Sequence, residues 1–85
     1  MAYKLIFKRS AINDLDKLDL VITKRIIHKL KWLAEQPDVY ADAVKLTDAK
    51  IGRYRLRIAD YRVIFDCRKQ DIFPLRIGHR KDIYQ

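Results

Sequence analysis

The residues that could do chemistry gather in one short stretch, Arg53–Arg62, which reads RYRLRIADYR. It contains four arginines, each beside an apolar or aromatic residue. A guanidinium stays charged at neutral pH and binds carboxylate or phosphate through paired hydrogen bonds. The stretch therefore predicts an anion-binding surface, and a phosphate that bridges several guanidinium groups is the obvious ligand.

The alternation of apolar residues and arginines indicates two strands joined by a tight turn. With Ala59-Asp60 as a two-residue turn, Arg57 faces Arg62 across the hairpin. Arg55, two residues earlier, shares their side of the sheet, away from the helices. Like charges directly opposite each other destabilise a sheet by up to about 1 kcal/mol, which suggests that this cluster is used for binding.

Two alternatives to this interpretation stay open at the level of sequence. Arginines also lie well on a plain solvated sheet face, where their stems cover apolar surface. Alanine is moreover a poor residue for a primed turn, which needs positive φ, and a longer loop would shift the pairing and move Arg62 away.

Composition narrows the class of protein. The chain has 85 residues, of which 49% are hydrophobic, and we expect a single domain over residues 1–85. Its formal net charge of +8 suggests a polyanionic partner, either nucleic acid or an acidic protein, although a basic surface can also serve solubility. No apolar run is long enough for a membrane span or a signal peptide. The single Cys67 rules out an internal disulfide, so we expect a cytoplasmic protein.

The elements that must position the arginines can be predicted from periodicity. Residues 3–8 alternate as a half-buried strand. Ser10 is predicted to cap a first helix that runs to about Leu18, and Asp19 a second helix that ends before Pro37. The second helix has an apolar stripe formed by Ile22, Ile26, Leu30 and Leu33.

The second half of the chain is predicted to contain three strands, at about 53–58, 61–67 and 71–77. Residues 38–52 are predicted to be irregular, with a short helical turn near Ala41–Leu46, and the tail from Gly78 to have no element of its own. Pro74 suggests an edge position or a break in the ladder. The order β-α-α-β-β-β predicts an α+β fold: a small, mostly antiparallel sheet with an N-terminal helical hairpin packed on one face.

The segments YRLRIADYRVIF and IGHRKDIY resemble the RelE toxins of bacterial and archaeal toxin–antitoxin pairs, within the RelE/ParE superfamily. The opening strand, the helix pair and the hairpin also fit, so the resemblance covers nearly the whole chain. It implies a ribosome-dependent mRNA interferase, an endoribonuclease that cuts the codon in the ribosomal A site and so inhibits translation. The RNA 2′-hydroxyl attacks the adjacent phosphate and the 5′-oxygen leaves, with no metal or other cofactor.

The resemblance also implies roles for individual residues. Arg55 and Arg57 lie where RelE toxins have basic residues on the strand before the hairpin. Arg62 would stabilise the charged phosphorane, and Arg80 would lie near the leaving oxygen. Tyr84 would be the C-terminal aromatic residue that contacts the target base.

Proton transfer is harder to assign, because well-studied RelE toxins have lysines where this chain has Arg55 and Arg57. An arginine is a poor acid or base, so these two are assigned electrostatic stabilisation of the transition state. His79 and Tyr84 are the other candidates for proton transfer. A hydrogen-bonded structural histidine at the end of a strand is an equally good interpretation of His79.

Other polar residues are predicted to be structural. His28 lies beside the apolar stripe without a second ligand at helical spacing, and Cys67 continues an inward alternation into the core. Asp14, Asp16 and Asp19 are interpreted as helix-end and surface acids rather than a catalytic pair.

The same resemblance leaves two rival functions open, a ParE-like inhibitor of DNA gyrase and an inactive relative that only binds its antitoxin or nucleic acid. The partners it implies are a cognate RelB-like antitoxin protein, mRNA and the ribosome with its rRNA, and no membrane. The docking segment of the antitoxin is expected to be acidic and partly helical.

Overall fold

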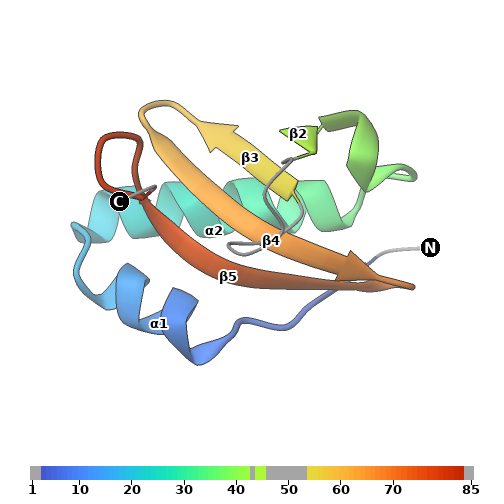
Figure 1. Ribbon diagram of the computed structural model, residues 1–85, viewed down its shortest axis with the longest axis horizontal. Coiled ribbons are helices and arrows are strands. Elements are labelled where there is room, and N and C mark those ends of the chain that lie inside the picture. The colour runs from blue at the N-terminus through green and yellow to red at the C-terminus, as the bar shows by residue number, and fades with distance from the viewer. Residues whose placement is uncertain (1–2, 43, 46–53, 84–85) are drawn as a thin grey trace.

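The computed structural model describes residues 3–42, 44–45 and 54–83, and these form an α+β fold (Figure 1). The helices are α1 (Arg9–Asp16), α2 (Leu20–Ala34) and the short 3-10 helix η1 (Val39–Asp42). The strands are β1 (Lys4–Leu5), β2 (Val44–Lys45), β3 (Tyr54–Ile58), β4 (Tyr61–Arg68) and β5 (Asp71–His79). None of the described helices has the length and apolar character that crossing a bilayer requires.

The strands form one sheet in the order β1-β5-β4-β3-β2. Three neighbouring pairs are antiparallel and only β1 runs parallel to its neighbour β5, so the predicted mostly antiparallel sheet is confirmed. The first strand is shorter than predicted, and β5 is longer because it continues through Gly78 to His79. The segment that was predicted to be irregular contains η1, which overlaps only the start of the helical turn predicted near Ala41–Leu46, and strand β2, which was not predicted.

The core lies between the helices and one face of the sheet, as predicted. Within the apolar stripe of α2, Ile26, Leu30 and Leu33 are fully buried, while Ile22 is half-buried against them. The strands contribute the buried side chains Leu56, Ile58, Val63, Phe65, Ile72 and Ile77. The opposite sheet face, which we call the outer face, is turned away from α2. Ile64 on this face is nevertheless fully buried, and Arg76 at its β5 side reaches Asp14 of α1.

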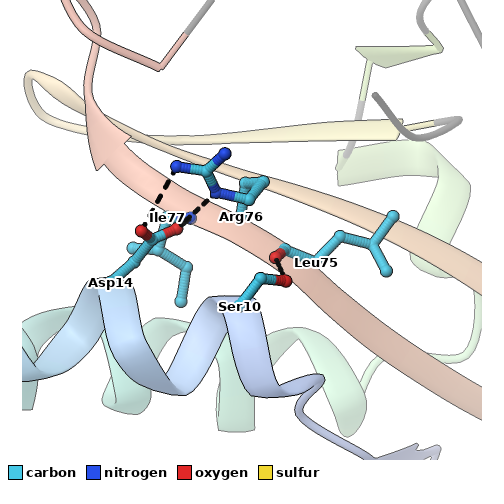
Figure 2. Close-up of polar contacts among 5 residues, drawn as sticks. All are labelled: Ser10, Asp14, Leu75, Arg76 and Ile77. Carbon is cyan, nitrogen blue, oxygen red and sulfur yellow. Dashed lines mark hydrogen bonds and ion pairs between the residues drawn. The ribbon is translucent and has the colours of Figure 1, made fainter. Parts of the chain in front are cut away.

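The two helix starts are stabilised differently. Asp19 caps α2 as predicted, since its carboxylate accepts a hydrogen bond from the Val21 N–H at 3.4 Å. The prediction that Ser10 caps α1 is wrong, because α1 begins at Arg9 and Ser10 lies within its first turn. The Ser10 hydroxyl instead donates to the Leu75 carbonyl of β5 at 2.6 Å (Figure 2).

Helix α1 takes the place of a strand along the edge of β5. Strand β1 pairs with the start of β5, and the Lys8 N–H still donates to the Pro74 carbonyl at 3.0 Å. Beyond that point the Asp14 carboxylate accepts the Ile77 N–H at 2.9 Å, one helical turn after Ser10 (Figure 2). Backbone groups that no strand reaches are thus satisfied by side chains of α1.

Asp14 also pairs with Arg76, whose Nε donates to Oδ2 at 2.8 Å. This hydrogen bond and the negative charge of the carboxylate raise the pKa of Arg76 above its ordinary value. Asp14 is buried, so its interpretation as a surface acid is wrong. The sequence around Asp14 does not show that it is buried, because both partners of its carboxylate lie more than sixty residues away in the chain.

Pro74 marks a break in the ladder between β4 and β5. The register shifts between Ile64, which pairs with Arg76, and Phe65, which pairs with Pro74, so Leu75 is the extra residue of a bulge. The predicted break is confirmed. The alternative of an edge strand is not, since β5 lies between β4 and β1.

The contacts of α1 with the edge of β5 predict that removing Asp14 and removing Arg76 lower the stability by different amounts. Asp14→Ala leaves the buried Ile77 N–H without an acceptor and is expected to lower the free energy of unfolding by about 1–3 kcal/mol. Arg76→Ala should cost less than about 1 kcal/mol, because its guanidinium is half-exposed and screened. Urea unfolding measures the stability of both variants. Asp16→Ala, which removes an exposed acid of the same helix, is the control. Equal losses for Asp14→Ala and Arg76→Ala would contradict this account.

Candidate functional site

The candidate site is organised by the tight turn between β3 and β4. Ala59 has φ 51°, and the register pairs Ile58 with Tyr61 and Arg57 with Arg62. The predicted two-residue turn is therefore confirmed. A residue with a Cβ in the left-handed region costs roughly 1 kcal/mol, a cost that the pairing of the two strands must offset.

Three of the predicted arginines share the outer face. Arg57 is exposed and Arg62 is half-buried, and the two are direct cross-strand partners. Arg55 pairs with Ile64, two residues further from the turn on the same face. Arg53, the first arginine of the stretch, lies outside the described residues. The structure thus brings Arg55, Arg57 and Arg62 together as the sequence predicts.

The guanidinium of Arg62 bends back over the turn. Its Nη1 donates to the carbonyl oxygens of Ala59 and Tyr61, each at 2.9 Å. These bonds fix the position of the cation relative to Arg57. Both Nη1 hydrogens are used in this way, so bidentate capture of an anion would fall to the Nε and Nη2 side of the guanidinium.

Arg80 is held at the same end of the sheet. Its backbone N–H donates to the Asp60 carbonyl at 2.7 Å, and its Nε lies 3.9 Å from the Asp60 carboxylate. Both side chains are exposed, so the ion pair itself contributes little. The backbone bond nevertheless holds the segment after β5 beside the hairpin turn (Figure 1). Asp60, which links the two segments, was not singled out from the sequence.

An apolar side chain packs beside the residue of β5 that pairs with Arg62. The cross-strand partner of Arg62 in β5 is Gly78, and a Cβ there would lie 3.7 Å from the Cβ of Ile83. Ile83 is buried and occupies the space next to Gly78. Tyr84, the predicted base-contacting residue, lies outside the described residues.

His79 lies on the other face of the sheet. It pairs with Tyr61, and the two rings meet edge to face with centroids 5.5 Å apart. Tyr61 is also the partner of buried Ile58, so this pair is on the helix side. The two rings help to line a groove of about 400 Å³ beside α1. The structure therefore does not bring the imidazole together with Arg57 and Arg62.

The tautomer of His79 is set by the backbone. Its Nδ1 accepts the Lys81 N–H at 3.2 Å, so the proton of the neutral ring is on Nε2. The same residue is thus hydrogen-bonded at the end of a strand, the structural arrangement that the sequence left as an alternative.

Two further polar residues were interpreted from the sequence as structural. His28 is exposed on α2, and Cys67 is half-buried against the core. A hydrogen bond with the Cys67 thiol raises the pKa of Tyr40 above its ordinary value, although the Tyr40 side chain is exposed.

Comparison with known proteins gives a consistent assignment of fold. The profile described as ParE toxin of type II toxin-antitoxin system, parDE, matches residues 5–84. A chain of the toxin–antitoxin complex RelBE2 from Mycobacterium tuberculosis is 24% identical, with a TM-score of 0.83 over 96% of this chain and 95% of that one. No protein with a curated description matches.

Two further solved structures are similar. The isolated RelE toxin of E. coli is 25% identical, with a TM-score of 0.72 over 98% of this chain and 92% of that one. A chain of the RelB–RelE complex from Methanococcus jannaschii is also 25% identical, with a TM-score of 0.72 over 93% of this chain and 94% of that one.

The paired arginines predict a gain in stability when their repulsion is removed. Arg57→Glu places an opposite charge across from Arg62 and is expected to raise the free energy of unfolding by about 0.5–1 kcal/mol. The neutral control Arg57→Gln should give a smaller gain. Added salt should reduce both differences, because the pair is solvent-exposed on one side. A loss of stability in Arg57→Glu, measured by urea unfolding, would show that the repulsion is insignificant.

Proposed function

The chain belongs to the ParE toxin family, within the RelE/ParE superfamily of type II toxins, and we propose that it inhibits translation by cutting mRNA in the ribosomal A site. The observation that carries this proposal is the outward-facing pair of Arg57 and Arg62, directly opposite each other in the sheet. Such a pair lowers stability when it is unoccupied. A phosphate of the RNA backbone would turn the repulsion into shared attraction.

The proposed reaction needs charge stabilisation more than any other contribution. The 2′-hydroxyl of one nucleotide attacks the adjacent phosphate, and the 5′-oxygen of the next nucleotide leaves, giving a 2′,3′-cyclic phosphate and a 5′-hydroxyl. Negative charge builds on the non-bridging oxygens, where Arg57 and Arg62 would bind. Arg55 adds positive charge along the same face, and Arg80 is proposed to bind near the leaving oxygen. Fixed cations of this kind stabilise a transition state without reorganising.

The two proton transfers are assigned to the ribosome rather than to the arginines. A guanidinium holds its proton too strongly to act as acid or base. His79 would have to act from the other face of the sheet. Groups of the ribosome that supply the base and the acid would also account for cleavage only on ribosomes. Tyr84 stays a proposal as the residue that contacts the target base.

A RelB-like antitoxin is the proposed protein partner. Similar chains occur in structures of complexes that are named after both toxin and antitoxin. The net charge of +8 favours an acidic docking segment, which would compete with RNA for the arginines of the outer face. Action on ribosomes would place the toxin in the cytoplasm.

The alternative function is inhibition of DNA gyrase, and one observation favours it. The matching family profile is that of ParE toxins, and the fold is shared by both kinds of toxin. Under that alternative the arginines of the outer face would serve binding only. The absence of lysine at positions 55 and 57 also keeps an inactive, antitoxin-binding relative as a third function.

Substitution at Arg62 tests the proposed chemistry. In a single-turnover assay on mRNA bound to purified ribosomes, Arg62→Ala is expected to slow A-site cleavage by about a hundredfold or more. Arg62→Lys keeps the charge but loses bidentate binding, so its rate should be intermediate. Lys31→Ala, an exposed cation on α2, is the control and should cut at the rate of the unchanged protein.

Two outcomes of that assay would overturn the proposal. The first is an unchanged rate for Arg62→Ala. The second is mRNA that stays intact with the unchanged protein, in which case a DNA supercoiling assay with gyrase decides between the binding functions.

A further inference from the structure

We propose that His79 is a positioning residue, which holds Arg80 beside the arginine pair and transfers no proton itself. The inference deepens the proposed function, because it concerns how one of the proposed phosphate-binding arginines is held. It rests on hydrogen bonds that tie the backbone of residues 80–83 to the His79 side chain and to the carbonyl groups of His79 and Asp60.

His79 binds the segment after β5 through both its backbone carbonyl and its side chain. Its carbonyl oxygen accepts the N–H groups of Asp82 at 2.9 Å and Ile83 at 3.0 Å. Its Nδ1 accepts the N–H of Lys81 at 3.2 Å. The remaining N–H of the segment, that of Arg80, donates to the Asp60 carbonyl at 2.7 Å. Every backbone N–H from 80 to 83 therefore has an acceptor, and this arrangement sets the direction in which the Arg80 side chain leaves the backbone.

The imidazole ring is itself fixed by β4. It stands edge-on to the Tyr61 ring, with an interplanar angle of 81°. Tyr61 precedes Arg62 and pairs with Ile58, the residue before the hairpin turn. The ring of His79 thus connects the strand that carries Arg62 with the turn that carries Arg80. Loss of the contact with Tyr61 or of the hydrogen bond to the Lys81 N–H would therefore displace Arg80 relative to Arg62.

Proton transfer by His79 fits this arrangement poorly. Its ring is on the helix side of the sheet, whereas Arg57 and Arg62 are on the outer face. The Nδ1 lone pair is already used by the Lys81 N–H, and a proton placed there would break that bond. The charged residues that line the same groove are Asp14, Lys17, Arg76 and Asp82.

Two substitutions separate an acceptor role from a proton-transfer role. His79→Asn keeps a side-chain oxygen that can accept an N–H two residues later, as asparagine does in turns. His79→Phe keeps an aromatic ring against Tyr61 but has no acceptor. In single-turnover cleavage on ribosomes, His79→Phe is expected to be slower by about tenfold to a hundredfold, the range that a small misplacement can cause. His79→Asn should retain most of the rate, and Lys81→Ala, which keeps its N–H, should retain all of it.

A double-substitution cycle tests whether the effect passes through Arg80. If His79 acts only by holding Arg80, His79→Phe should cost nothing further in the background of Arg80→Ala. His79→Asn and His79→Phe could instead slow cleavage equally, and do so also in the background of Arg80→Ala. This would show that the ring nitrogen takes part in the chemistry. That result would overturn the proposal.

Amide hydrogen exchange gives a measurement that does not depend on activity. The Lys81 N–H should exchange faster in His79→Phe than in the unchanged protein, and His79→Asn should restore its protection. Unchanged exchange in His79→Phe would overturn the inference whatever the toxin does to RNA. Should the unchanged toxin leave mRNA intact, the proposed function fails, and exchange alone decides whether His79 holds the turn.

Discussion

The arginine pair of the outer face depends on the two-residue turn between β3 and β4. Ala59 adopts the left-handed conformation, and this sets the register that places Arg57 opposite Arg62. A slip of one residue would move every side chain of the strand to the other face and put arginines into the core. The buried apolar residues on the helix side therefore enforce the position of the charged ones on the outer face. Packing of the core thus keeps Arg57 and Arg62 opposite each other despite the repulsion between their like charges.

The other segments of the fold supply partners for backbone groups that the short sheet leaves open. Helix α1 satisfies the edge of β5 through Ser10 and Asp14, where β1 has ended. At the C-terminal end of β5 the turn after His79 does the same for the last residues that the structure describes. Strand β5 is thus held at Leu75 and Ile77 and again after His79, and it in turn pairs with the strand that carries Arg62. A toxin this small has little other core with which to keep its cations in place.

Sequence alone predicted the parts that depend on local pattern. The hairpin register followed from alternation together with one assumption about turn length, and the cap at Asp19 followed from its place before an apolar stripe. The parts that depend on contacts distant in the chain could not be predicted in this way. Asp14 resembles any exposed helix acid until β5 is placed beside it, and Ser10 resembles a cap. His79 was placed in a tail with no element of its own, with a structural role at the end of a strand as one interpretation. Nothing local shows that β5 continues past Gly78 and sets the ring against Tyr61.

The most direct test of the central claim is cleavage of an mRNA that carries a single 2′-deoxynucleotide in the A-site codon. An otherwise identical all-ribose mRNA is the control, and both are bound to purified ribosomes. If the arginines stabilise attack by the RNA's own 2′-hydroxyl, the all-ribose control should be cut. The mRNA with the 2′-deoxynucleotide should stay intact at the substituted position. Cleavage of both RNAs would contradict the mechanism. If both stay intact, the arginine pair does not serve RNA cleavage at all.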